Sequence, residues 1–163
     1  MSYPEPRYAG DGGEISATFR RADAPAELRY RGSGNSVHYL ATGAVTEGRF
    51  GLYRWDFSAA ASGPGPHFHR TISESFFILS GTVRLYDGRD WVDATAGDFS
   101  YVPEGGIHAF RNESGQEASM LILFAPGAPR EEYFETLANE GTRAMSDPER
   151  AEFYLRHDNV WLE

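Results

Sequence analysis

The amino-acid sequence predicts an all-β domain followed by a short helical segment. From about residue 37 to residue 125, short runs of aromatic and branched side chains are separated by turns rich in glycine, proline and aspartate. After Pro126-Gly127 the apolar spacing changes from the two residues of a strand to the three or four of a helix. The chain should therefore be mostly β, with helices at its C-terminal end.

The length of 163 residues gives room for one hydrophobic core and is too short for two. We expect an N-terminal arm over residues 1–27, because Pro, Gly, Ala and charged residues follow one another there without a period. The β domain is expected over residues 28–127 and a helical extension over residues 128–163. No repeat or low-complexity tract interrupts this order.

The strands are predicted from alternation and from the turns between them. Residues 37–41 and 49–59 read as the first two, and in the second the side chains expected in the core are Gly51, Tyr53, Trp55 and Phe57. Asp87-Gly88 is a hairpin dipeptide, so Asp87 is interpreted as structural. Residues 118–125 are so apolar that both faces of this strand should be covered.

Two helices are predicted in the extension. The first begins near Glu131, ends at Gly141 and should pack on the outside of the β domain through one apolar side, formed by Tyr133, Phe134, Leu137 and Ala138. The second has Asp147 as N-cap and Pro148 at its first position, and runs to about Arg156. Its inner face is expected to hold Ala151, Tyr154 and Leu155.

Three histidines and a glutamate stand at spacings that core packing does not require: His67, His69, Glu74 and His108. His67 and His69 are two residues apart, so they project from the same side of a strand. Glu74 opens the next apolar run after a short bend, and His108 follows a turn rich in proline and glycine. Imidazole and carboxylate bind divalent first-row metals, so the four residues predict a metal site.

These two stretches resemble the two signature motifs of the cupin superfamily in its single-domain form. The first runs from His67 through His69 and Glu74 to Gly81, and the second has its matching residues at Gly97, Pro103, Gly105, His108 and Asn112. The chain departs from the first motif at Ala61, where the family has glycine, and Gly63 and Gly65 supply flexibility instead.

The resemblance implies a small antiparallel β-barrel of the jelly-roll type. It also implies one divalent transition metal per chain, held inside the barrel by His67, His69, Glu74 and His108. Three nitrogens and one oxygen suit Ni, Co, Mn, Fe, Cu or Zn, so the ligand set does not name the ion. Because ligands on one side of an ion leave positions open, the site should perform chemistry on a bound substrate.

Within the superfamily, the sequence looks most similar to small bacterial cupins related to quercetin (flavonol) dioxygenases. That resemblance implies that the metal binds an enolate-type oxygen and that Glu74 is ligand, base or both. A zinc-type polyketide cyclase or isomerase that uses no oxygen is the alternative enzyme, and a small-ligand-binding cupin is the non-enzymatic one. Three aromatic residues near the site would suit a flat apolar substrate or would simply fill the barrel: Phe76, Tyr101 and Phe110.

The charge and composition limit the partners. A net charge of −9 without a basic run disfavours nucleic acid and anionic membranes, and no apolar stretch is long enough to span a bilayer. The chain has no cysteine, and residues 1–5 lack the segments of a signal peptide, so we expect a cytoplasmic location. Sheet edges, the apolar strand near Met120 and the proline-rich arm lead us to expect a homodimer.

Overall fold

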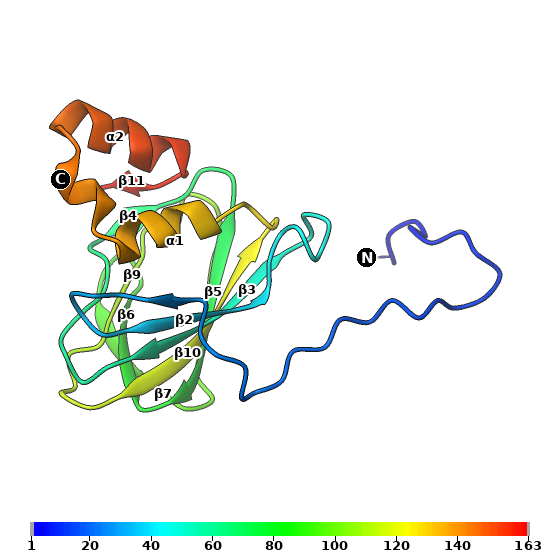
Figure 1. The fold of residues 1–163 in the computed structure, drawn as a ribbon, viewed down its shortest axis with the longest axis horizontal. Coiled ribbons are helices and arrows are strands. Elements are labelled where there is room, and N and C mark those ends of the chain that lie inside the picture. The colour runs from blue at the N-terminus through cyan, green and yellow to red at the C-terminus, as the bar shows by residue number, and fades with distance from the viewer. Residues whose placement is uncertain (1, 163) are drawn as a thin grey trace.

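A computed structural model describes residues 2–162. The largest sheet has six antiparallel strands in the order β1-β2-β3-β10-β5-β8, with these bounds: β1 Leu28–Arg29, β2 Ser36–Ala41, β3 Gly51–Phe57, β10 Ala118–Ala125, β5 Ser73–Ser80 and β8 Phe99–Val102. A three-stranded antiparallel sheet contains β7 Trp91–Thr95, β6 Thr82–Tyr86 and β9 Ala109–Arg111. A third pair joins β11 Val160–Trp161 to β4 His67–Phe68. The predicted antiparallel jelly roll is confirmed (Figure 1).

The core fills the space between the sheets. Along β3 every second residue is buried, which confirms the predicted inward positions Gly51, Tyr53, Trp55 and Phe57. Strand β10 alternates in the same way, with Met120 and Ile122 fully inside, but its other face is only half buried. The expectation that both faces of this strand are covered is therefore wrong for the single chain.

The turns follow the predicted chemistry. Asp87 directly follows β6 in the β6–β7 hairpin, and its Oδ1 accepts hydrogen bonds from the backbone N–H groups of Arg89 and Asp90, both at 2.8 Å. Gly88 has φ +94°, which side chains with a Cβ rarely adopt. Asp87 is thus a structural turn residue, as predicted.

The C-terminal extension lies across one end of the barrel (Figure 1). Helix α1 Glu131–Ala138 is followed by the 3₁₀ turn η1 Gly141–Ala144, helix α2 Asp147–Arg156 and strand β11. The predicted apolar side of α1 is confirmed, because Tyr133, Phe134 and Ala138 are buried. The helix covers the end of the barrel, where the Phe134 ring lies 5.3 Å from Tyr53 and 5.6 Å from Trp55. No helix in residues 2–162 is long and apolar enough to cross a bilayer.

Helix α2 differs from its prediction in start and in phase. Its N-cap is Ser146 and not Asp147, because Ser146 and Glu149 form a reciprocal capping box. Its buried residue is Phe153, which stacks on Tyr133 with ring centroids 5.7 Å apart. Leu155, predicted to face inward, is 64% exposed. Ala151 is also exposed, and Tyr154 alone of the three is partly buried.

The N-terminal arm, residues 2–27, runs along the surface and then away from the barrel (Figure 1). Nearly all of its side chains are exposed. It is attached near its end, where Arg20 forms an ion pair with Glu27 at 2.8 Å and donates to the carbonyl of Tyr39.

Candidate metal centre

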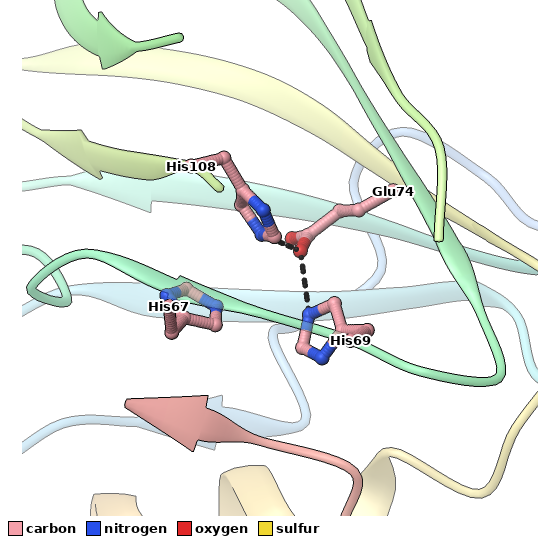
Figure 2. A group of neighbouring side chains, drawn as sticks. All are labelled: His67, His69, Glu74 and His108. Atoms are coloured by element: carbon pink, nitrogen blue, oxygen red, sulfur yellow. Dashed lines mark hydrogen bonds and ion pairs between the residues drawn. The ribbon is translucent and has the colours of Figure 1, made fainter. Parts of the chain in front are cut away.

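Four buried side chains converge inside the barrel: His67, His69, Glu74 and His108. One possible ligand atom from each lies within 4.8 Å of the others. Figure 2 shows the three imidazoles and the carboxylate pointing toward one another, with His67 and His69 on one segment of the chain and Glu74 and His108 on others. The structure therefore brings together all four residues that the sequence predicted.

The backbone around the site explains this convergence. His67 lies in β4, and its N–H and C=O exchange hydrogen bonds with His108 at 3.0 and 2.9 Å, so the two motifs are joined directly. Glu74 is the second residue of β5, which lies between β10 and the edge strand β8 in the large sheet. The bend between His69 and Glu74 restores the inward phase, as the odd spacing requires.

This chain has Ala61 where the first motif of the family has a glycine, and Gly63 takes over the role of that glycine. Its φ is +145°, and a Cβ at this position would lie 2.0 Å from the carbonyl oxygen of Phe110. Only glycine permits this approach of the loop before His67 to strand β9. The departure at Ala61 leaves the ligands in place.

Each histidine is oriented by a backbone carbonyl at its outer ring nitrogen. The Nδ1 atoms of His67 and His108 lie 2.9 Å from the carbonyls of Gly65 and Gly106, and Nδ1 of His69 lies 2.6 Å from the carbonyl of Asp158. A carbonyl only accepts, so each Nδ1 carries the proton. In a neutral ring the remaining lone pair is then on Nε2. This arrangement is typical of histidines that bind metal through Nε2.

Glu74 is the acidic member of the site. Its Oε2 lies 3.0 Å from Nε2 of His69 and 2.8 Å from Nε2 of His108 (Figure 2). Burial acts to raise the pKa of Glu74, but hydrogen bonds from His108 and His69 outweigh it, and the pKa is held far below its usual range. Burial is also the largest effect on His108, where it acts to lower the pKa, yet the Glu74 carboxylate raises it overall.

His67 behaves differently from the other two imidazoles. Burial, and then the proximity of His108, lower its pKa from 6.5 to about 4. It therefore stays neutral near pH 7 and keeps its Nε2 lone pair available. Its ring centroid lies 4.4 Å from that of His108 and 5.1 Å from that of His69.

The donor set fits a divalent transition metal. A carboxylate oxygen 2.8–3.0 Å from two Nε2 atoms is stable only if those atoms carry protons or if a cation lies among the four groups. Three imidazoles with fixed Nδ1 protons and one carboxylate offer the nitrogen and oxygen donors that such ions bind. No other group of three or more His, Cys, Asp or Glu in residues 2–162 is arranged in this way.

Sequence reasoning missed Asp158, which contacts His69 and the turn that follows it. Its carbonyl holds His69, while its carboxylate accepts from the N–H groups of Arg70 and Thr71 at 2.9 and 2.8 Å. The Thr71 hydroxyl donates to the same carboxylate at 2.7 Å. Asp158 is also one of the few non-glycine residues with positive φ, +55°. Its place directly after α2 was the one available signal, since short polar residues favour such positions.

A cavity of about 330 Å³ adjoins the site. His67 and Glu74 line it from the barrel side, and Phe110, which the sequence predicted for the substrate pocket, forms part of its wall. Phe76 is fully buried beside Phe110, with ring centroids 5.5 Å apart, but does not reach the cavity. Tyr101 is 59% exposed on the opposite face of the sheet, because it pairs with Ser75 and so has the opposite phase to Glu74.

The sequence and the structure both resemble known proteins. Residues 53–124 match the cupin domain family. A quercetin 2,3-dioxygenase from Bacillus subtilis is 26% identical over 131 residues, which cover 74% of this chain and 36% of that enzyme. An uncharacterised protein from Aquifex aeolicus is 31% identical over 61 residues, or 37% of this chain and 50% of that protein. The chain thus spans half or less of the curated relatives it matches.

Solved structures share the fold at low identity. A predicted oxalate decarboxylase from Thermotoga maritima superposes with a TM-score of 0.54 at 20% identity, over 61% of this chain and 94% of that one. An RmlC-like cupin from Shewanella frigidimarina gives 0.51 at 20% identity, over 66% and 88%. KdgF from Halomonas sp. gives 0.53 at 14% identity, over 61% and 87%.

The molecule is a jelly-roll β protein whose interior holds a site of three histidines and one carboxylate. Residues 53–124 of this jelly roll match the cupin domain family, as the resemblance of the two motifs predicted.

Proposed function

We propose that this protein is a metal-dependent dioxygenase that acts on a flavonol or another hydroxylated aromatic compound. The observation that carries the proposal is the joint position of His67 and Glu74, which belong to the four-residue centre and also line an aromatic-walled cavity. A substrate bound in this cavity would lie directly beside the four-residue centre. The similarity to a quercetin 2,3-dioxygenase supports the same reaction class.

The chain supplies four groups for this chemistry. His67, His69 and His108 would hold the ion through Nε2, and Glu74 would either complete the ligand set or act as a base. When bound, the ion supplies Lewis acidity toward a substrate oxygen and, if it is redox-active, supports reaction with dioxygen. The burial of all four side chains excludes bulk water from the reacting groups.

The role of Glu74 as base depends on its neighbours. In the form in which His69 and His108 donate Nε2 protons to it, the carboxylate is a weak base, because these bonds stabilise its charge. If the two imidazoles use Nε2 lone pairs for a metal, those hydrogen bonds no longer exist, and the carboxylate can accept a proton from a substrate hydroxyl. The O–H bond of the substrate then breaks as the carboxylic acid forms.

Oxygen uptake with quercetin tests the proposal. Protein loaded separately with Ni, Co, Mn, Fe, Cu or Zn should consume one O₂ per quercetin lost with at least one of these ions, and chelator-treated protein should consume none. Glu74→Gln keeps an oxygen donor and removes the base, so its rate per bound metal should fall roughly a hundredfold. Turnover without oxygen uptake would favour the cyclase or isomerase alternative, and binding without turnover would favour a small-ligand-binding protein.

A further inference from the structure

The C-terminal extension supplies part of the wall of the cavity next to the candidate metal centre. Its walls come from strand β3, from the loop before β4, from α1 and from the segment after α2. Aromatic residues and one arginine form much of the lining: Tyr30, Trp55, Phe110, Arg130, Phe134 and Trp161. Residues from outside the matched domain, 53–124, therefore decide much of the chemistry of the cavity.

Arg130 is a buried cation in the wall of this cavity. Only 4% of the residue is exposed. Its guanidinium donates from Nη1 to the carbonyl of His157 at 2.5 Å and from Nη2 to Oδ1 of Asn159 at 2.9 Å. Both acceptors are uncharged, and no carboxylate of residues 2–162 lies within ion-pairing distance of it. Its Nε is buried without a hydrogen-bond partner in the described part of the chain.

Within residues 2–162, the Arg130 guanidinium has no counterion. Three rings lie near Cζ of Arg130, with the centroid of Tyr133 at 4.3 Å, Phe124 at 5.1 Å and Phe134 at 5.6 Å. Such cation–π contacts offset part of the cost of burying the charge, but a buried cation is stabilised far more by an anion. Glu74 lines the same cavity, yet the hydrogen bonds of its carboxylate go to His69 and His108.

Three further polar atoms in the lining residues are also without partners in residues 2–162. They are the hydroxyl of Tyr30, Nε1 of Trp55 and Nε1 of Trp161. Indole and guanidinium N–H groups can only donate, and buried donors in folded proteins are nearly always paired. The cavity therefore suits a ligand that carries several acceptor oxygens. Its aromatic walls, such as Phe110 and Phe134, suit a flat apolar body.

We propose that Arg130 is the anion-recognition group of the substrate cavity and that the natural ligand is a hydroxylated aromatic carboxylate. The carboxylate would accept from the guanidinium, which forms paired hydrogen bonds with such groups, and the ring would lie among the aromatic walls. Arg130 is a specificity-determining residue in this proposal. It rests on the proposed function for the interpretation of the cavity as the substrate site, and it narrows the substrate class.

The test compares benzoate with benzamide, which has nearly the same shape without the charge. Binding is measured by calorimetry and by the fluorescence of the tryptophans, on chelator-treated and on metal-loaded wild-type protein. Benzoate should bind at least roughly tenfold more tightly than benzamide in both forms. Arg130→Gln should remove this preference, and Arg130→Lys should keep part of it, because the charge stays and the planar fork is lost.

Arg84→Gln is the matched control. It removes the same charge, but Arg84 lies on β6, where it pairs with Asp93 and Glu113 at 3.0 Å and does not line the cavity. The preference for benzoate should be unchanged in this variant. Circular dichroism and thermal melting establish that each variant is folded, which matters because Arg130 holds His157 and Asn159.

Two results would overturn the proposal. Equal binding of benzoate and benzamide by chelator-treated wild-type protein would do so without any variant. A benzoate preference that appears only after metal loading and persists in Arg130→Gln would show that the carboxylate binds the ion instead. The chelator-treated measurement involves neither metal nor turnover. An absence of oxygen uptake would therefore count against the proposed function and leave this inference standing. Equal binding of benzoate and benzamide would count against this inference and leave the proposed function standing.

Discussion

The carbonyl oxygen of Asp158 lies 2.6 Å from Nδ1 of His69, 89 positions away in the sequence. The residues on either side of Asp158 bind Arg130, through the carbonyl of His157 and the side chain of Asn159. Three consecutive residues thus connect a predicted metal ligand to the buried cation of the adjoining cavity. The C-terminal extension therefore positions groups at both the candidate metal centre and the cavity.

The Asp158 carboxylate should affect metal affinity although it is not a ligand. It fixes the turn at Arg70 and Thr71, directly after His69. We expect Asp158→Ala to weaken metal binding roughly tenfold or more, as is typical when groups that orient a ligand are removed. Asp158→Asn keeps an acceptor oxygen and should recover part of the affinity. Competition with a chromophoric chelator measures both.

Asp87→Ala provides the control for Asp158. The Asp87 carboxylate also accepts two backbone N–H hydrogen bonds, at 2.8 Å, but in the distant β6–β7 hairpin. Its loss should lower stability without changing metal affinity. If both variants lowered the affinity equally, the effect of Asp158 would be one of general stability and not of ligand orientation.

The three histidines should act as one unit. All are buried, and their possible ligand atoms lie with that of Glu74 within 4.8 Å. His67→Ala, His69→Ala and His108→Ala should each reduce bound metal sharply, because the remaining donors cannot complete the coordination. Elemental analysis of protein purified without a chelator or a His tag gives the content. Near-stoichiometric metal in all three variants would rule out this centre, and His38→Ala, which changes a histidine outside it, should retain the metal.

The metal-free protein should lose stability as pH falls from 6.5 toward 4. The pKa of His67 is lowered from 6.5 to about 4, so the unfolded chain binds a proton there at a higher pH than the folded chain. The contribution of His67 to the free energy of unfolding is therefore present above pH 6.5. It is lost between pH 6.5 and about 4, by up to about 3 kcal/mol. The lowered pKa of Glu74 acts in the same direction at still lower pH, whereas the raised pKa of His108 adds stability as pH falls from its folded-state pKa to 6.5.

Denaturant titrations from pH 7 to pH 4.5 measure this effect. His67→Gln carries no proton-binding group and should show a shallower decline than the wild type, while carboxylates elsewhere affect both proteins equally. Identical slopes would mean that His67 is not held neutral by its surroundings. Metal added to the wild type should be released over the same pH range, since protons and the ion compete for the imidazoles.

The sequence predicted the metal centre better than the residues around it. The spacing of the four residues indicates on which side of a strand each one lies, and this phase is a local property of the sequence. The structure brings all four together: His67, His69, Glu74 and His108. By contrast, the position of Arg130 and Asp158 depends on β11 pairing with β4, and no local period encodes a contact between segments so far apart.

The remaining differences have local physical causes. Tyr101 lies outside because β8 pairs with β5 in a register that gives Tyr101 the phase of Ser75, and register cannot be derived from one strand alone. In α2, the stacking of Phe153 on Tyr133 determines which face is buried, so Leu155 turns outward. The arm, barrel and extension boundaries proposed from composition remain predictions.

We propose, finally, that the protein forms a homodimer whose interface is the outer face of the six-stranded sheet. Phe77 is 40% exposed there and pairs in register with both Phe99, which is 64% exposed, and Leu121 on β10. Strand β8 is also the edge of this sheet, with one side of its backbone unpaired within residues 2–162. A second copy would bury this apolar surface and satisfy the edge.

Light scattering at micromolar concentration should therefore give twice the chain mass of 18.1 kDa. Phe99→Glu should shift the mass toward the monomer, because it places a charge in the interface, whereas Leu155→Glu, at an equally exposed leucine on α2, should leave the dimer intact. A monomer mass for the wild type, or equal effects of the two substitutions, would contradict this assignment of the interface.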